Sequence, residues 1–357
     1  MSQRISQREL AHLAGVSAAT VSRALSDHPA ISQEVAHRIK ALARKMDYRP
    51  SAAARSFVTR RHTTIGLVIC DRPLSVTVYA VLASTVEQAT RDRGLKLQLT
   101  LCDSGQFTRD QLPPLFQDDG VDGVILTGAV PDWLLERLRT WRMPCVLLGS
   151  QPGLAGVSQV TGDARQAGRL AADHLLEQGH RDIGLLLGPR TRPMHKHYFL
   201  GFRDGCLEAG FEPRDIEAML VECTSNDAVP PMRQLISRRR DLTALFANTD
   251  LIAWQAVQFL RAIGRDVPGQ VSVIGAGGTV GDPTHPASTL TSVDVRLPEM
   301  ARAAVQLLQE MIERPDTPSR RIVIDPHLSV GQTVAPRGAS GCATSPVSPA
   351  TVGASSS

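Results

Sequence analysis

The sequence predicts a small all-α head followed by a larger α/β body that contains two parallel sheets. Three observations lead to this fold class. Apolar residues recur at helical spacing over residues 10–46. From Thr63 onward, short apolar runs alternate with longer amphipathic stretches, for example Val81–Arg93 and Gly201–Ala209, which is the pattern of βαβ units. The charge is also uneven, because residues 1–61 hold 11 Lys and Arg against 4 Asp and Glu, a net +7, whereas the remainder is net −3.

Length and composition narrow the class of protein. A chain of 357 residues with 42% hydrophobic residues is expected to fold into two or three globular domains. Its apolar runs are far shorter than the roughly 18 residues of a membrane span, and MSQRISQREL has no secretory h-region. Six cysteines without a CxxC predict buried thiols, among them Cys70, Cys102 and Cys145, rather than disulfides or a zinc site. We expect a cytoplasmic protein without membrane, metal or cofactor.

The head is predicted to contain three short helices. Gly15 can end the first helix because glycine tolerates a positive φ. Ser17 is expected to cap a second helix over roughly Ala18–Leu25, and Ser32 a third. The residues predicted at core-facing helical spacing are Leu10, Leu13, Ala14, Val21, Ala24, Leu25, Val35, Ile39, Leu42 and Met46. A helix, a tight glycine turn and a short second helix form the helix-turn-helix motif that reads DNA.

The second helix carries the side chains that would contact DNA. The guanidinium of Arg23 matches the two acceptors of guanine in the major groove. Small residues at the helix start allow close approach, and hydroxyl groups can bond phosphates. The predicted contacts are Ser17, Ala18, Ala19, Thr20, Ser22 and Arg23. The alternative is a three-helix domain that binds another protein.

The pattern AGVSxxTVSRxL over Ala14–Leu25, followed by DYRP at 47–50, resembles the head of the lac repressor (LacI/GalR) family of transcription regulators. The resemblance implies a DNA-binding domain over 1–50 and a hinge helix over 51–62 that folds when two subunits meet on DNA. In that hinge, Ala54 and Phe57 are implied DNA contacts. Phe57 stands where the family usually has a Leu that wedges into the minor groove. The alternative is an ordinary linker.

The body contains stretches that resemble the family's periplasmic-binding-protein-like core. They include TIGLVI at 64–69, HLLEQGHRDIGLLLG at 174–188, DVPGQVSVIG at 266–275 and LTSVDVRLPEM at 290–300. The resemblance implies an effector-binding and dimerisation core over 63–336. Its first lobe would be about 63–161 plus 292–322, and its second about 162–291 plus 323–336. Residues 337–357 are small and polar and are expected to be a disordered tail.

The resemblance also implies a pocket between the lobes, where this sequence departs from the family. Gly149, Tyr198 and Gly277 replace an Asp, an Arg and an Asp that hold neutral sugars. The run His195–His197 adds positive charge, so we expect an anionic effector such as a sugar acid or sugar phosphate. The alternative for that run is a solvated loop. The effector-binding residues implied are Leu74, Val76, Lys196, Tyr198, Thr249, Asp250 and Gly277.

We therefore predict a homodimeric regulator, most often a repressor in this family, on a pseudo-palindromic DNA operator. No C-terminal leucine heptad follows Leu328, which favours a dimer over a tetramer. The rival class is a solute-binding protein without a DNA role, which the basic head disfavours. An enzyme is disfavoured because GxxxxGK[ST], HExxH and GxSxG are absent. His195 and His197 lack a third metal ligand, and Arg238–Arg240 is a phosphate site or an exposed helix end.

Overall fold

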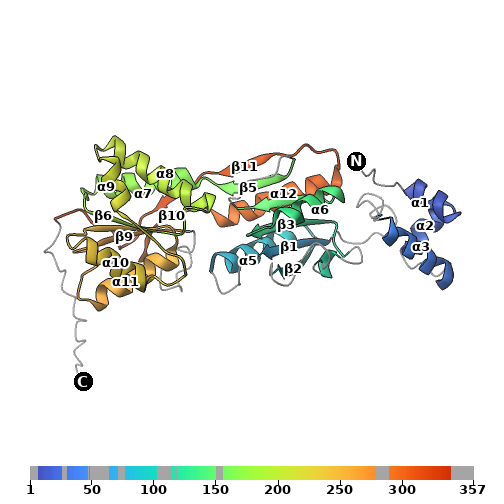
Figure 1. The fold of residues 1–357 in the computed structure, drawn as a ribbon, viewed down its shortest axis with the longest axis horizontal. Coiled ribbons are helices and arrows are strands. Elements are labelled where there is room, and N and C mark those ends of the chain that lie inside the picture. The colour runs from blue at the N-terminus through green and yellow to red at the C-terminus, as the bar shows by residue number, and fades with distance from the viewer. Residues whose placement is uncertain are drawn as a thin grey trace, which may run out of the picture. The chain divides into compact units, whose positions relative to one another are not determined.

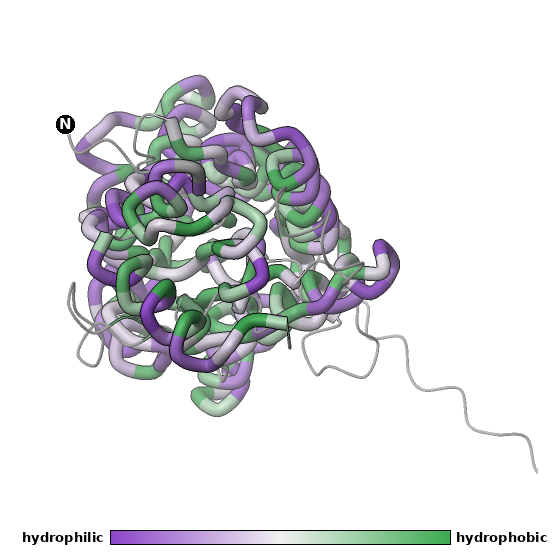
Figure 2. Tube along the Cα trace, turned by 90° about the vertical axis from the view of Figure 1, so that its right-hand side faces the viewer, coloured by the Kyte–Doolittle hydropathy of each residue, from purple (hydrophilic) through white to green (hydrophobic). Residues whose placement is uncertain are grey.

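The computed structural model describes residues 7–25, 30–46, 48, 64–70, 77–102, 112, 114–116, 120–149, 156–277 and 289–338. The chain divides into two compact units and crosses between them several times. The first unit takes residues up to 166, 277–279 and 294–327, and the second takes 167–276, 280–293 and 328 onward. Coloured by hydropathy, the chain alternates between hydrophobic and hydrophilic segments throughout (Figure 2).

The head consists of α1 (Gln7–Ala14), α2 (Ala18–Leu25) and α3 (Gln33–Lys45), drawn in blue in Figure 1. The three helices bury a small apolar core made of Leu10, Ala11, Val21, Ala24, Ile39 and Ala43. The predicted second and third helices are confirmed. Leu13 and Met46 were predicted at core-facing positions, but their side chains are 54% and 37% exposed. Leu10, Ala11 and Ala14 form the core-facing side of α1, and Leu13 therefore lies on the flank of the helix.

The first unit is built on a six-stranded sheet with the order β11-β5-β4-β3-β1-β2. Every neighbouring pair in it is parallel. Its strands are β1 (Thr64–Cys70), β2 (Lys96–Cys102), β3 (Gly123–Gly128), β4 (Cys145–Leu148), β5 (Ser158–Gly162) and β11 (Arg321–Ile324). Its helices are α5 (Thr77–Arg91), α6 (Asp132–Thr140), α12 (Leu297–Glu313) and the 3₁₀ turn η1 (Pro114–Phe116). Apolar side chains along the strands point alternately to the two faces of the sheet. One face therefore packs on α5 and α12, and the other packs on α6.

The second unit repeats this architecture with the order β12-β10-β9-β8-β6-β7. Its strands are β6 (Ile183–Leu187), β7 (Leu220–Glu222), β8 (Ala244–Ala247), β9 (Ser272–Ala276), β10 (Thr291–Asp294) and β12 (His327–Ser329). Its helices are α7 (Ala164–Glu177), α8 (Pro193–Glu208), α9 (Pro213–Ala218), α10 (Val229–Arg238) and α11 (Asp250–Ala262). Helices α10 and α11 cover one face of the sheet, and α7 and α8 lie on the other (Figure 1).

Late in the chain, the two points at which it passes from one unit to the other differ from the predicted lobe boundaries. All of β11 pairs with β5, so 323 and 324 belong to the first sheet rather than to the second. Strand β10 pairs with β9, so 292 and 293 belong to the second sheet rather than to the first. The hydrogen-bond partner of a strand decides its sheet, and for β11 that partner lies far earlier in the sequence.

Two helices begin earlier than predicted. Helix α5 begins at Thr77 rather than at Val81, and α8 begins at Pro193 rather than at Gly201. Pro193 suits the start of α8 because its fixed φ matches the first helical turn, where an N–H has no intrahelical partner. Residues 195–197 are therefore helical, and their interpretation as a loop is wrong. Among the helices described, none is long and apolar enough to cross a membrane.

Candidate nucleic-acid interface and effector site

The turn between α1 and α2 fixes where the second helix of the head begins. Gly15 has a φ of 66°, a left-handed conformation that glycine adopts without strain. The Val16 N–H then donates to Ala11 O at 3.0 Å and closes α1. The Gln7 Nε2 of α1 also donates to Ala18 O at 2.9 Å, which ties the first helix to the start of the second.

Ser17 caps α2 as predicted. Its Oγ accepts the Thr20 N–H at 3.0 Å and lies 2.8 Å from Thr20 Oγ1, so one hydroxyl donates to the other. This arrangement satisfies a backbone N–H that the first turn of a helix leaves without a partner. It also places two hydroxyl groups at the positive end of the α2 dipole, where phosphate oxygens bind favourably.

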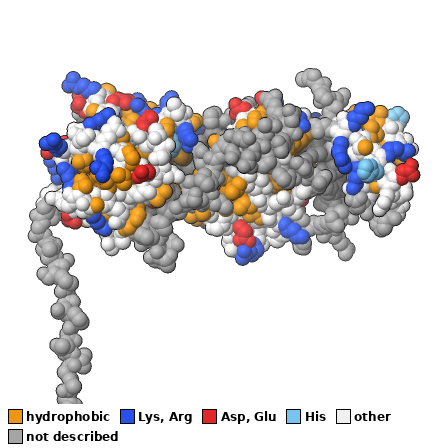
Figure 3. Space-filling model, turned by 60° about the horizontal axis from the view of Figure 1, so that its bottom comes forward, with side chains coloured by type: hydrophobic (Ala, Val, Ile, Leu, Met, Phe, Trp, Pro, Cys, Tyr) orange, Lys and Arg blue, Asp and Glu red, His pale blue; other side chains and the backbone are white. Residues whose placement is uncertain are grey.

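The predicted DNA-contacting residues do not all face outward. Ser17, Ala19 and Arg23 are exposed, whereas Thr20 and Ser22 are half-buried. Ala18 was predicted to face outward, but it is half-buried and packs against the core of the head. Lys and Arg side chains, blue in Figure 3, outnumber acidic ones on the head at the right of that view.

In the second unit, polar side chains gather where the parallel strands end. Gly188 follows β6, and Asn248 follows β8 and is 5% exposed. The Gly188 N–H donates to Asn248 Oδ1 at 3.2 Å, which leaves Nδ2 of the amide to donate to His195 Nδ1 at 2.6 Å. A Cβ at position 188 would lie 2.4 Å from the His195 ring, so the glycine makes room for this contact.

This bonding order selects one form of the imidazole. Because Nδ1 of His195 accepts from Asn248, that nitrogen carries no proton, and the arrangement fits the neutral ring. A protonated ring would place two donors against each other, or would turn the Asn248 amide away from the Gly188 N–H. His195 therefore does not contribute to the positive charge predicted for this region, whereas Lys196 is exposed on the first turns of α8.

Thr249 and Asp250 begin α11 beside this cluster. The Thr249 Oγ1 accepts the Ile252 N–H at 3.2 Å and caps the helix. The Asp250 side chain is 2% exposed, and the Ser292 hydroxyl of β10 donates to its Oδ1 at 2.5 Å. The helix N-terminus adds favourable dipole energy to this buried carboxylate. Sequence reasoning missed Asn248 and Ser292, since neither stands in a recognisable motif.

Two other predicted effector residues, Tyr198 and Gly277, lie at different depths. The Tyr198 side chain is 4% exposed, and its ring centroid lies 6.1 Å from that of Phe246 in the core. Burial, with a smaller contribution from Asp250, raises the pKa of Tyr198, so the phenol stays neutral. Gly277 directly follows β9 and is half-buried. The structure therefore gathers His195, Asn248 and Thr249–Asp250 at one sheet edge, with Tyr198 beneath it.

Comparison with known proteins identifies the family that has this arrangement. The model for bacterial regulatory proteins of the lacI family matches residues 7–51, and a periplasmic binding protein-like domain matches 172–334. The HTH-type transcriptional regulator CelR of Thermobifida fusca is 32% identical over 91% of this chain and 96% of its own length. The chain belongs to the lacI family. It is accordingly a DNA-binding transcriptional regulator with a periplasmic binding protein-like domain, and members of this family are not enzymes.

Solved structures of family members agree with the fold. The CelR–cellobiose complex superposes with a TM-score of 0.67 at 30% identity, covering 92% of this chain and all of that one. A lac repressor dimer bound to operator and an anti-inducer superposes with a TM-score of 0.64 at 16% identity, covering 93% of this chain and all of that one. The HTH-type transcriptional regulator MalR of Streptomyces coelicolor is 30% identical over 93% of this chain and 98% of its own length.

Some predicted family residues lie outside the described residues. They are Ala54 and Phe57 of the hinge, and Leu74 and Val76 of the first lobe. Of the tail predicted over 337–357, residues 337 and 338 are described, and the Arg337 N–H donates to Gln178 O at 2.8 Å; the rest lies outside the described part of the chain. Among the residues that are described, no three His, Cys, Asp or Glu side chains come together in a way that could hold a metal ion.

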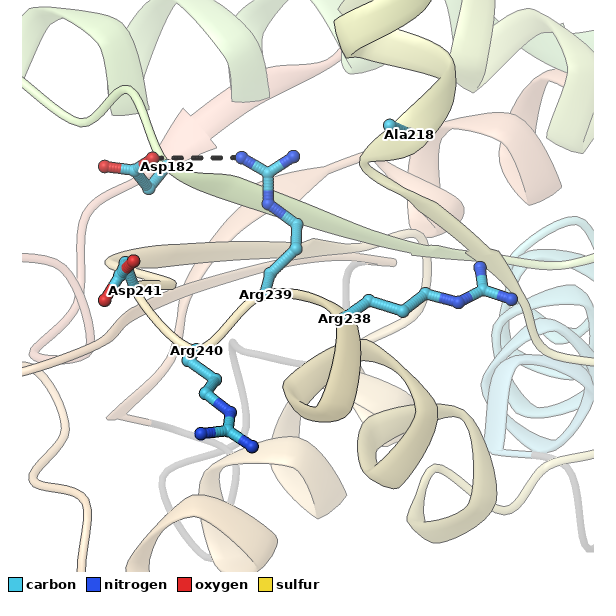
Figure 4. A pocket seen from close by; sticks show the side chains of 6 residues that line it. All are labelled: Asp182, Ala218, Arg238, Arg239, Arg240 and Asp241. Carbon is cyan, nitrogen blue, oxygen red and sulfur yellow. Dashed lines mark ion pairs between the residues drawn. The ribbon is translucent and has the colours of Figure 1, made fainter.

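The arginine run at the end of α10 lies at the opposite edge of the second sheet. The Arg239 guanidinium pairs with Asp182 at 3.8 Å, and Asp241 adds a second carboxylate to the pocket there. In Figure 4 the guanidinium groups of residues 238, 239 and 240 point in three different directions. Cations are also favoured at the C-terminus of any helix. The structure supports the exposed helix end over the phosphate site.

Proposed function

We propose that this family member is a cytoplasmic repressor that binds a pseudo-palindromic operator as a homodimer, with its affinity set by a small effector between the two lobes. The observation that carries the DNA role is the start of α2. There a serine cap, a small exposed residue and an exposed arginine follow one another as Ser17, Ala19 and Arg23. Each head would place α2 in one major groove, with the two half-sites in successive turns of DNA.

Base readout and backbone contact are assigned to different side chains. Arg23 presents parallel N–H donors that match O6 and N7 of guanine. Ser17 and Thr20 present hydroxyls beside the helix N-terminus, which suits phosphate oxygens. A truncated Arg23 should therefore relax the preference at one base pair in each half-site, at a cost of about 1–3 kcal/mol.

The test is selection of bound sequences from a random duplex pool, followed by titration of the selected duplex at two salt concentrations. We expect a palindrome, and Arg23→Ala should lose discrimination at one position of each half. Arg214→Ala is the matched control, because that side chain is 86% exposed on α9 in the second unit. A failure of the wild-type chain to select any motif would favour the rival, a solute-binding protein without a DNA role. An equal loss on all sequences for Arg23→Ala would make it a phosphate contact.

The homodimer is proposed from an uncovered apolar surface on the first unit. Strand β2 is an edge strand, and its Leu99 and Leu101 side chains are 42% and 48% exposed. Leu97 and Leu99 line a groove against Ala80, Ala83, Ser84 and Glu87 of α5. A second copy fits this surface because two heads must be held together to read a palindrome. Hydrophobic side chains, orange in Figure 3, are exposed on the body in that view.

Sedimentation of the full chain at several concentrations tests this surface. Leu99→Lys places a charge in the proposed interface and should shift the chain from dimer toward monomer. Val330→Lys is the control, because Val330 is 70% exposed in the second unit and lies outside the groove. A dimer that withstands Leu99→Lys as well as it withstands Val330→Lys would remove this surface from the proposal.

The effector is proposed to be an anionic sugar derivative. Gly149 and Gly277 provide no carboxylate where family members often have one, and Lys196 is exposed on α8. A carboxylate or phosphate would find one cation and no opposing acid among these three positions. A neutral disaccharide is the second candidate, since the relative at 30% identity was solved with cellobiose.

Isothermal titration separates the two effector classes. Galacturonate, gluconate, glucose 6-phosphate and cellobiose are titrated into the full chain, and Lys196→Ala is compared with Lys96→Ala on β2. A charge-assisted hydrogen bond contributes about 1.5–3 kcal/mol, so Lys196→Ala should weaken an anionic ligand roughly tenfold or more. Binding of cellobiose alone, unaffected by Lys196→Ala, would overturn the anionic effector and leave the regulator proposal intact.

A further inference from the structure

Two cysteines end neighbouring strands of the first sheet. Cys70 is the last residue of β1 and Cys102 is the last residue of β2, the edge strand beside it (Figure 1). The two strands run parallel, and Cys70 and Cys102 are direct partners in their register. Both side chains belong to the apolar cluster on the α6 face of the sheet, where they are 1% and 3% exposed.

This placement brings the two sulfur atoms within bridging range. Neighbouring strands lie about 4.8 Å apart, and disulfides join Cα atoms about 4.4–6.8 Å apart. Side chains in register on parallel strands project to the same face, so neither cysteine has to turn around. The Cβ atoms of a disulfide are about 3.8 Å apart and so lie closer together than its Cα atoms, which means that the end of β2 must rotate to tilt the Cα–Cβ bond of Cys102 toward β1. An edge strand has a hydrogen-bonded neighbour strand on one side only, and it can make such a move.

We propose that Cys70 and Cys102 form an oxidation site that converts reversibly to a disulfide when the protein meets a peroxide. One thiolate attacks the peroxide, becomes a sulfenic acid and releases hydroxide, which takes up the proton of that thiol. The second thiol then attacks the sulfenic sulfur, the S–S bond forms, and water leaves. The two sulfurs together give two electrons to the peroxide, and two water molecules form for each hydrogen peroxide consumed.

Cys70 and Cys102 are partners in strand register, whereas none of the other described cysteines stands opposite a cysteine. Cys145 stands opposite Val124 in its register, Cys206 lies within α8, and Cys223 follows β7. Burial of Cys70 and Cys102 slows the attack of either thiol on the peroxide. The attack on the resulting sulfenic acid is intramolecular, because the partner thiol lies beside it at the sheet edge. The rotation required of β2 strains the bridge, and strained disulfides are the more readily reduced ones. A thiol reductant should therefore restore the pair.

The experiment uses the full reduced chain, treated with hydrogen peroxide, then unfolded in urea and alkylated with iodoacetamide. Mass spectrometry of the unreduced digest should show one peptide pair joined through Cys70 and Cys102, and two of the six thiols should be lost. Dithiothreitol should return both thiols. Cys102→Ser should abolish the joined pair, whereas Cys145→Ser, a matched buried thiol in the same sheet, should leave it unchanged.

Three results would overturn the proposal. The first is full alkylation of both cysteines after a peroxide dose that oxidises the exposed Met194 of the same molecules. The second is conversion of either cysteine to sulfinic acid without a joined peptide. The third is a bridge between two chains instead of within one. The wild-type digest decides all three, so the outcome does not depend on whether Cys102→Ser folds.

Discussion

Ser17 is assigned two roles, capping α2 and donating to a phosphate, and a pair of substitutions separates them. Ser17→Ala removes the Oγ that accepts the Thr20 N–H at 3.0 Å. Loss of such a cap costs about 1 kcal/mol of helix stability. Ser17→Asp keeps an oxygen at the same position, because Asp caps as well as Ser does. It places a negative charge beside the proposed phosphate, so it should leave the helix intact and weaken DNA binding.

The expected loss of DNA affinity follows from the number of hydroxyl hydrogens on Ser17 and Thr20. Ser17 and Thr20 have one hydroxyl hydrogen each, and their 2.8 Å contact uses one of the two. When the Thr20 hydroxyl donates to Ser17, the hydrogen of Ser17 remains for a phosphate oxygen. A hydrogen bond to a charged group contributes about 1.5–3 kcal/mol, so two heads lose about 3–6 kcal/mol per operator. Because 1.4 kcal/mol is tenfold, affinity should fall about 100-fold or more for both variants.

Hydrogen exchange of the free chain measures the cap, and titration of the selected duplex measures the phosphate contact. Ser32→Ala is the control, since Ser32 Oγ caps α3 in the same head by accepting the Val35 N–H at 3.4 Å. It should lower protection in α3 and leave DNA affinity nearly unchanged. Unchanged protection of α2 in Ser17→Ala would refute the cap. Wild-type affinity of Ser17→Asp would refute the phosphate contact.

Three further outcomes are expected. Gly168→Ala should cost about 3 kcal/mol in urea unfolding, at the top of the range for overpacking, because its Cβ would lie 2.1 Å from Tyr198 O and 3.0 Å from Phe202 N. Burial lowers the pKa of His180 and of His174 from 6.5, so the folded state binds fewer protons than the unfolded state. The melting temperature should therefore fall as the pH drops below 6.5, and His180→Gln should reduce this dependence. Operator affinity should fall linearly on a log–log plot against salt, and its slope gives the number of neutralised phosphates.

The head could be predicted closely because its signals are local. Ser17 and Ser32 each cap the helix that begins at the next residue, and Gly15 ends the helix before it. The interactions that define α2 and its turn span only a few residues, so their pattern is visible in the sequence. The prediction for Leu13 was wrong because, in a helix of two turns, a residue three positions after Leu10 can lie on the flank of the helix as readily as in the core.

The lobe boundaries and the sheet-edge cluster were less predictable, because they depend on partners far apart in the chain. Strand β11 has the same short apolar character whichever sheet it joins, and only its pairing with β5 decides. Asn248 and His195 are 53 residues apart, and their contact requires the glycine at 188. A single asparagine after a strand carries no signal of such a contact. The resemblance identified the positions next to it, Thr249 and Asp250, but not Asn248 itself.

The same cluster constrains how the proposed effector could alter operator affinity. An effector shifts an equilibrium between two states only through a difference in its affinity for them. Gly188, Asn248 and His195 are bonded to one another within the second unit, and Ser292 holds Asp250 within it as well. These groups keep the same geometry in any state that preserves the second unit, so they contribute equally to both affinities. On the proposed function, the contacts that discriminate between the states must come from the first unit. Substitutions in the second-unit cluster should therefore change how tightly the effector binds and leave unchanged the factor by which a saturating effector alters operator affinity.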